Sequence, residues 1–367
     1  MDVVKYAIPI FLGLLALEIA LNAFLKKSYY AKADSMANLG AGILSQLSGF
    51  ISKPFLLYTY YLFFNFFTNS LTGVFESEFL LFNMIPGTFA KWAFAFLMVD
   101  LMYYWLHRHY HTVNLMWAFH VIHHSSEEYN LSVALRQSSF GFIIGFVYQI
   151  PIAVLGIPPE VFFTCYGVNL LYQFWIHTRL IPKMTSPLGR AFEFSMNTPS
   201  HHRVHHARQM KYLDKNYAGT FIIWDRMFGS FVEEDIEPKY GIYPRYQKFN
   251  PVMANVDPLL EIWKYFKIAP TFSLKMKVLF GSPLWLFETF KKGEVAKAIK
   301  FNGDASTSSF AVFGLSLVLT IVLLFFGKGL SAVSKTILAL SITTMLYLVG
   351  KLCDEKLRAS AKTQTSR

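Results

Sequence analysis

The chain has 367 residues, of which 54% are hydrophobic, 17% are aromatic and only 16% carry a charge. About a quarter of the residues in soluble domains are charged, so this composition is typical of a membrane protein. The formal net charge of +11 is explained by cytoplasmic Lys and Arg and by anionic lipid, and no nucleic-acid motif accompanies it. With only Cys165 and Cys353, a disulfide framework and a cysteine-type zinc site are excluded.

The N-terminal part predicts two membrane helices. Residues 6–25 are apolar and long enough to cross a bilayer. Lys26 and Lys27 follow directly, which places this end of the helix in the cytoplasm. Residues 28–47 are rich in small side chains and are expected to lie in the membrane interface, and residues 48–68 predict an aromatic-rich second span.

A third span is predicted over residues 88–106, after a loop at 73–86. It carries Asp100 near its cytoplasmic end, and a carboxylate inside a membrane span is a candidate functional residue. Asp100 lies seven residues, or two helical turns, before His107 and therefore on the same face. We expect Asp100 to accept the second N–H of a metal-bound imidazole, with a helix–helix hydrogen bond as the alternative.

Residues 139–157 and 159–177 predict a membrane hairpin. Its turn, residues 156–159, contains one glycine and two prolines, which end one helix and start the next. The hairpin returns His177 to the membrane depth at which the third span ends. Because His177 returns to the depth of the histidine motifs, we expect it to be an additional metal ligand.

The region 178–305 is polar to amphipathic, and Asp225 follows Trp224 in an apolar stretch of it. We expect Asp225, like Asp100, to hydrogen-bond a ligand imidazole and fix its orientation. Lysines interleaved with aromatic and aliphatic residues suit helices on an anionic membrane surface, although an ordinary solvated edge has the same pattern. These lysines are Lys264, Lys267, Lys275, Lys277, Lys291, Lys292, Lys297 and Lys300.

Two further apolar stretches, 308–327 and 329–350, predict a C-terminal membrane hairpin. The whole chain is thus divided into five parts: N-terminal transmembrane helices (1–86), a histidine-rich core with the membrane hairpin 139–177 (87–235), a basic interfacial segment (236–305), the C-terminal hairpin (306–350) and a basic cytoplasmic tail (351–367).

All eleven histidines fall between residues 107 and 206, and their spacing repeats as i, i+3 and i+4. On a helix these positions share one face. Together with His177, the same-face histidines form a set of nine: His107, His111, His120, His123, His124, His177, His202, His205 and His206. His109 and His201 fall off these faces and are expected to be ordinary hydrogen-bonded residues.

Nine imidazoles predict two metal ions, because one ion takes four to six ligands. The expected fold is all-α: a polytopic membrane protein with a cytoplasm-facing histidine-rich di-metal site built on helix ends. Neutral imidazoles suit iron, zinc or copper; two zinc ions would indicate hydrolysis, and two iron ions O2 chemistry on aliphatic C–H bonds. Metal transport is a distant alternative, because transporters place their ligands near the bilayer midplane and not past helix ends.

The motifs HRHYH (107–111), HVIHH (120–124) and HHRVHH (201–206) resemble the fatty-acid hydroxylase/sterol desaturase superfamily of membrane di-iron enzymes. The segments 123–138, 173–178 and 197–231 resemble more closely its alkylglycerol monooxygenases, which cleave ether lipids. The resemblance implies two Fe ions, O2 and oxidation of the carbon beside an ether oxygen, giving an aldehyde and a glycerol derivative. Hydroxylation or desaturation of a fatty acyl chain, sterol or carotenoid is the alternative within the superfamily.

The resemblance also bears on the electron donor. In the alkylglycerol monooxygenases a glutamate after the first motif is tied to tetrahydrobiopterin, and this chain has Thr112 there. Two external donors therefore stay open, a pterin and a redox protein.

We further expect a membrane lipid substrate whose head is held at the cytoplasmic surface by Arg136 and Gln137, just before the span at 139–157. A polar head is costly to bury in hydrocarbon, so the chain alone would enter the membrane side of the site. The alternative is that Arg136 is an ordinary cytoplasmic residue whose side chain reaches lipid phosphates.

Overall fold

A computed structural model of the chain describes residues 3–72, 80–243, 248–291 and 305–365. They form helices, turns and two isolated β-bridges, in agreement with the predicted all-α fold. Residues 73–79 of the predicted loop at 73–86 lie outside the described residues, as do Lys292, Lys297 and Lys300.

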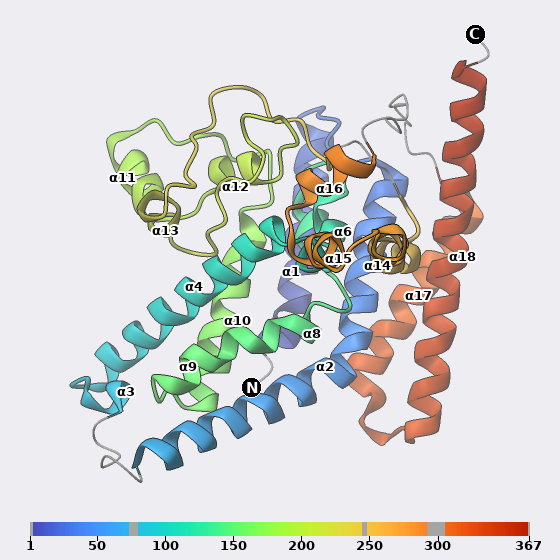
Figure 1. Ribbon diagram of the computed structural model, residues 1–367. Coiled ribbons are helices and arrows are strands. Elements are labelled where there is room, and N and C mark those ends of the chain that lie inside the picture. The colour runs from blue at the N-terminus through green and yellow to red at the C-terminus, as the bar shows by residue number, and fades with distance from the viewer. Residues whose placement is uncertain (1–2, 73–79, 244–247, 292–304, 366–367) are drawn as a thin grey trace.

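Long helices form the lower part of the view in Figure 1 and short helices gather above them. The long ones are α1 (Val3–Phe24), α2 (Lys32–Thr72), α4 (Thr88–Thr112), α10 (Pro159–Trp175), α17 (Thr307–Phe326) and α18 (Ala332–Thr365). The short helices in the upper part of the view are α11 (Pro187–Ser195), α12 (Pro199–His205), α13 (Ile223–Met227) and α16 (Pro283–Phe290), with α15 (Phe272–Phe280) and the longer α14 (Pro251–Ile268) below α16. Connecting turns contain α3 (Leu81–Met84), α5 (Asn114–Trp117), α6 (Val121–His124), α7 (Leu131–Ala134), α8 (Phe142–Gly145), η2 (Phe146–Gln149), α9 (Ile150–Val154) and η3 (Gly327–Gly329).

Three helices of the described residues are long and apolar enough to cross a membrane: Tyr6–Phe24, Thr307–Gly329 and Ala332–Ala359. They match the predicted first span and C-terminal hairpin. The other predicted spans fold as helices but fall short of that length or hydropathy. The hairpin 139–177 is broken into α8, η2 and α9 before α10, whose 17 residues span about 25 Å against a hydrocarbon core of about 30 Å.

Helix α2 differs from the prediction, because the interfacial segment 28–47 and the span 48–68 form one helix of 41 residues. Its two halves face different surroundings. The first half buries Asp34 and Asn38 against the histidine-rich region. The second half exposes large apolar side chains, among them Leu57, Leu62 and Phe66, on a surface suited to lipid.

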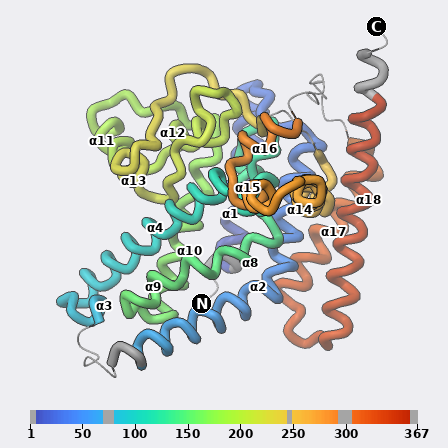
Figure 2. The backbone as a smooth tube through the Cα atoms, viewed as in Figure 1, coloured from blue at the N-terminus to red at the C-terminus, as the bar shows by residue number. Residues whose placement is uncertain are grey.

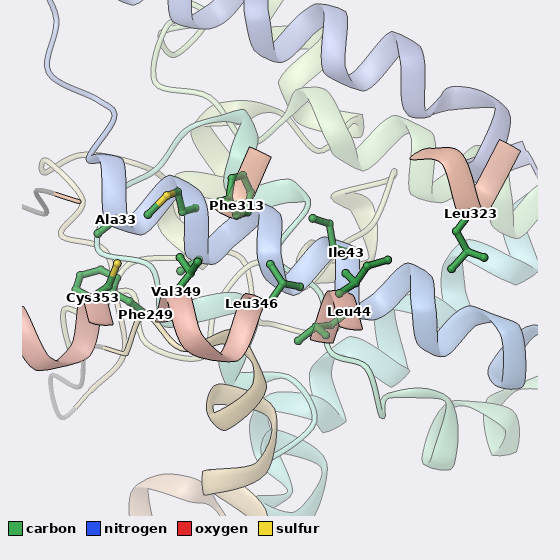
Figure 3. Close-up of a cluster of buried hydrophobic side chains, with 12 residues drawn as sticks. Ala33, Ile43, Leu44, Phe249, Phe313, Leu323, Leu346, Val349 and Cys353 are labelled. Atoms are coloured by element: carbon green, nitrogen blue, oxygen red, sulfur yellow. The ribbon is translucent and has the colours of Figure 1, made fainter. Parts of the chain in front are cut away.

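The C-terminal hairpin packs against the first half of α2, as the tube in Figure 2 shows. Figure 3 shows the apolar cluster at this contact, with Ile43 and Leu44 of α2 beside Leu346 and Val349 of α18. A second cluster joins α2, α4, α9 and α10, where the Tyr60 hydroxyl donates to a backbone carbonyl. These two cores fix α2 and α4 around the histidine-rich region.

Candidate metal centre

Four chain segments bring the predicted histidines together. The last turns of α4 carry His107 and His111, the short helix α6 and the residue before it carry three more, the end of α10 is followed by His177, and α12 and its C-cap carry the last three. Pro199 is the first residue of α12, where the fixed φ angle of proline suits a helical turn. All nine predicted side chains are buried.

The nine histidines divide into two groups. Within each group, one ring nitrogen per residue lies within 4.8 Å of those of the others. The larger group consists of His107, His111, His120, His124 and His205. The smaller group consists of His123, His177, His202 and His206. Groups of four and five ligands fit two ions and the ligand numbers expected for each.

Adjacent histidines supply different groups. His123 joins the smaller group and His124 the larger, while His205 joins the larger and His206 the smaller. Successive residues on a helix point about 100° apart. A pair of neighbouring histidines can therefore reach two sites that lie side by side, which is how α6 and α12 each serve both groups.

Backbone carbonyls hold four of the imidazoles. The Nδ1 atoms of His107, His123, His177 and His205 lie 2.7, 3.0, 2.8 and 2.9 Å from the carbonyl oxygens of Tyr217, Arg136, Gln173 and Lys215. A carbonyl oxygen only accepts, so each Nδ1 carries the proton. This fixes the tautomer and leaves the Nε2 lone pair for a metal.

The free Nε2 atoms converge on one another. Those of His123 and His177 lie 3.4 Å apart, and both carry lone pairs because their Nδ1 atoms are protonated. Two lone pairs facing each other in a buried site call for a shared cation. Metal–nitrogen bonds of about 2.1 Å place neighbouring ligand atoms about 3.4 Å apart in a tetrahedral site, so the donor set fits a bound metal ion.

Burial favours the neutral form of most of these imidazoles. It lowers the pKa of His120, His124 and His202 well below the usual 6.5, and the neighbouring imidazoles lower it further. It also lowers the pKa of His123 to about 4. Because metal ions bind the neutral form, this environment is prepared for coordination near neutral pH.

A largely apolar cavity of about 420 Å³ opens onto both groups, where His107 and His120 of the larger and His123, His177 and His202 of the smaller line it. Its outer wall includes side chains of the candidate membrane spans α1 and α17, such as Phe11 and Leu317. The volume lies in the range of about 300–1,000 Å³ common for ligand sites. The cavity thus connects the candidate metal centre to surfaces that lipid would cover.

Residues 92–230 match the family model described as fatty acid hydroxylase, and this segment contains all nine histidines. This part of the chain is therefore similar to the fatty acid hydroxylase family. Alkylglycerol monooxygenase from Homo sapiens is 40% identical over 285 residues, which cover 77% of this chain and 60% of the human protein. The Xenopus tropicalis alkylglycerol monooxygenase is 39% identical over 284 residues, with the same coverage.

A bacterial protein of the comparison is more distant. Ornithine lipid hydroxylase OlsE from Rhizobium tropici is 29% identical over 151 residues, or 38% of this chain and 43% of that protein. The chain spans about three fifths of the length of the human and Xenopus relatives. No solved structure matches it.

Asp225 was predicted to hydrogen-bond a ligand imidazole, but its hydrogen bonds go to the chain beside the histidine groups. Its carboxylate accepts from the backbone N–H groups of Tyr217 and Ala218, at 2.8 Å each, and from the Ser230 hydroxyl at 2.6 Å. Because the Tyr217 carbonyl in turn binds His107, Asp225 acts on the ligand through one peptide unit. Burial raises the pKa of Asp225 to about 6, against the opposing effect of these three donors.

Asp100 likewise binds the loop after residue 216 and not His107. It accepts from the backbone N–H groups of Thr220 and Phe221 and from the Trp224 indole, at 2.8–3.0 Å. The prediction had the correct helical face, but this loop lies between the carboxylate and the imidazoles. Gly219 permits that close approach, because a Cβ there would lie 2.9 Å from Asp100 Oδ1.

The predicted role of Arg136 as a lipid anchor is wrong, because only 1% of its surface is exposed. Its guanidinium donates to the Ile122 carbonyl at 2.6 Å, to Asn38 Oδ1 at 2.9 Å and to the Ser125 hydroxyl at 2.7 Å. The Arg136 side chain therefore stabilises α6, and its backbone carbonyl accepts a hydrogen bond from His123 Nδ1. Gln137 is exposed and lines the cavity, so its predicted contact with substrate stays a prediction.

The remaining predicted residues are placed as follows. His109 and His201 lie outside both groups; His109 Nδ1 is 2.5 Å from the Tyr148 hydroxyl, and His201 packs on Phe231. Thr112 ends α4, and its hydroxyl donates to the Arg108 carbonyl. The sequence did not indicate the carbonyls that orient the imidazoles, since every residue has a carbonyl whatever its side chain.

Proposed function

We propose that this protein is a membrane-bound di-iron monooxygenase that hydroxylates a lipid at the carbon next to an ether oxygen, using O2. The observation that carries the proposal is the uncharged cavity that opens onto both histidine groups. The similarity to alkylglycerol monooxygenases supports the choice of an ether lipid. Metal transport, the distant alternative, receives no support from the family match.

Two iron ions bound by these groups would supply O2 activation and oxidation of an aliphatic C–H bond. Overall, one C–H bond, O2, two electrons and two protons give a C–OH group and water. A hydroxyl on the ether carbon makes a hemiacetal, which breaks its C–O bond to give an aldehyde and a glycerol hydroxyl. The electrons come from an external donor, either tetrahydrobiopterin or a redox protein.

The protein's own contribution is to orient the ligands and to exclude water. Carbonyls of Arg136, Gln173, Lys215 and Tyr217 fix four imidazoles, so the site does not need to reorganise when metal binds. Apolar side chains on the cavity wall keep bulk water from the oxidising site.

We also propose that the site faces the cytoplasm. Helix α1 ends at Phe24 and is followed by Lys26 and Lys27, which favours that end inside the cell.

The proposal is tested with the protein in nanodiscs, loaded with Fe(II) and given O2, a 1-O-alkylglycerol and either tetrahydrobiopterin or a reducing redox protein. The expected product is a trapped fatty aldehyde whose length equals that of the alkyl chain, and elemental analysis should find about two iron ions per chain. The proposal would be contradicted if the site bound zinc in preference to iron. It would also be contradicted if the ether stayed unreacted with each of the two donors.

A second candidate is hydroxylation within an acyl chain. The similarity to an ornithine lipid hydroxylase favours it, and the same site serves either reaction. Products that keep the ether bond and gain one oxygen on a fatty chain would identify this second activity.

A further inference from the structure

The cavity beside the metal centre has an uncharged wall. Among its lining residues in the described part of the chain there is no Lys, Arg, Asp or Glu. Its polar atoms belong to histidines, tyrosines, hydroxyl groups and glutamines. Moving a phosphate or an ammonium group into such a space without a counter-charge is costly, so the wall disfavours a charged lipid head.

Two of the glutamines stand out because part of each amide has no partner. The Oε1 atoms of Gln46 in α2 and Gln149 in η2 are buried without a hydrogen bond, and the whole Gln149 side chain is only 6% exposed. The other two lining glutamines are engaged within the protein: Gln137 donates to the Ala134 carbonyl, and Gln173 donates to Asn169.

A buried amide oxygen without a donor is destabilising, so a ligand that satisfies it binds more tightly. The terminal torsion of glutamine is soft, and each amide can turn to present its oxygen or its NH2 group. Both amides line the same cavity, Gln46 from α2 and Gln149 from η2. The wall at Gln149 adjoins the first histidine motif, because Tyr148, next to Gln149, binds His109.

We propose that Gln46 and Gln149 bind the hydroxyl groups of an uncharged lipid head inside the cavity, and so select neutral hydroxylated lipids over lipids with a charged head. A hydroxyl group matches an amide on both counts, since each donates and accepts. The inference deepens the proposed function, on which it rests for the choice of an alkylglycerol as the ligand. The lipid head would then bind the uncharged amides in the cavity, and not Arg136 as the sequence predicted.

The test is a binding measurement that does not require turnover. Purified protein in nanodiscs of uncharged lipid binds radiolabelled 1-O-hexadecylglycerol, and three competitors are compared. These are the unlabelled diol, its 2,3-di-O-methyl ether, which lacks the donors, and the 1-O-hexadecylglycerophosphocholine. We expect the diol to compete about tenfold better than either of the other two, as a site built for a hydroxyl rejects analogues without it.

Variants then assign the preference to the amides. Gln149→Met and Gln46→Met keep the side-chain length, and each should reduce the preference for the diol several-fold. Thr320→Val is the matched control, because Thr320 also lines the cavity but its hydroxyl donates to the Ser316 carbonyl of its own helix. It should keep the wild-type preference.

Equal competition by the diol and its dimethyl ether in the wild-type protein would overturn the proposal, even if no variant folds. So would an unchanged preference in both glutamine variants, or phosphocholine binding as tight as diol binding. If the diol is preferred but no aldehyde forms with iron, O2 and a donor, the proposed function fails and this binding site stands.

Discussion

At the scale of single residues, the site combines side chains that bind with backbone groups that aim them. Four imidazoles donate from Nδ1 to carbonyl oxygens, which leaves the Nε2 atoms of His107 and His205 for the larger group and those of His123 and His177 for the smaller group. A carbonyl is a rigid acceptor held by the fold, so it positions a ring with little loss of side-chain entropy. The carboxylates Asp100 and Asp225 hold the loop that presents two of these carbonyls.

His123→Ala should abolish metal binding at the smaller group, because it removes one of four ligands and leaves three neutral imidazoles. We expect elemental analysis to show at least half of the bound metal lost, with activity lost as well. His109→Ala is the matched control, since His109 lies outside both groups. Full metal content in His123→Ala would contradict the proposed ligand set.

Asp225→Asn should weaken metal binding about 10- to 100-fold, the usual effect of disturbing an outer partner of a ligand. The N–H groups of Tyr217 and Ala218 bind different oxygens of the carboxylate, and asparagine replaces one of these oxygens with an NH2 group that cannot accept, so the carbonyl that holds His107 shifts. Metal affinity is measured by competition with a chelator. The surface exchange Glu233→Gln serves as control, and equal affinities in the two variants would show that Asp225 has no such role.

At the scale of elements, α2 is shaped by two different neighbours. Its first half approaches the 131–138 segment closely, and its second half faces lipid-like surroundings. Polar side chains in the first half, Asp34 and Asn38, bind Ser126, Ser132 and Arg136 beneath the histidines. The mixed composition that suggested an interfacial segment therefore reflects contact with the 126–136 segment, which follows the second histidine motif.

Gly42→Ala should destabilise the protein, because a Cβ at this position would lie 2.6 Å from the Leu135 carbonyl oxygen. We expect a cost of about 1–3 kcal/mol from the forced shift of α2, seen as a lower thermal unfolding temperature. Gly13→Ala in α1 is the control, since nothing lies within 4 Å of its added Cβ; alanine there should be neutral or favourable. Equal unfolding temperatures for the two variants would show that the contact tolerates a methyl group.

At the scale of the whole molecule, many buried imidazoles make folding depend on metal and on pH. In the folded state burial lowers the pKa of most of these imidazoles below 6.5, so below that pH the unfolded chain binds more protons than the folded one. Stability is then fully present above about pH 6.5 and is lost as the pH falls. For one histidine, each unit by which its pKa is lowered on folding changes the free energy of unfolding by about 1.4 kcal/mol.

Metal-free protein should therefore lose thermal stability steeply when the pH is lowered from about 7.5 to 5.5. His123, with its pKa of about 4, and its neighbours stay neutral while their unfolded counterparts take up protons. Removing metal at pH 7.5 with a chelator should also lower the unfolding temperature, because the metal binds only the folded site. An unfolding temperature that does not change over this pH range would contradict the neutral, buried state of the imidazoles.

The proposed orientation can be tested by labelling. Both native cysteines are buried, so a single new cysteine reports its side of the membrane. We expect Met210→Cys, near α12, to react with an impermeant thiol reagent only after the cells are opened, and Leu330→Cys, between α17 and α18, to react in intact cells. Met210 is 60% exposed and Leu330 39%. The opposite result would reverse the orientation.

The sequence by itself determined the all-α class, the first and last membrane helices and the nine histidines of the site. These follow from local properties, since apolar length and helical phase can be read from consecutive residues. Tertiary packing decided the rest. It divided the histidines into groups of five and four, buried Arg136 in place of exposing it to lipid, and placed a loop between Asp100 and the imidazoles. These outcomes depend on which faces of distant segments meet, and on backbone carbonyls that no side-chain pattern marks, so only the folded chain contains them.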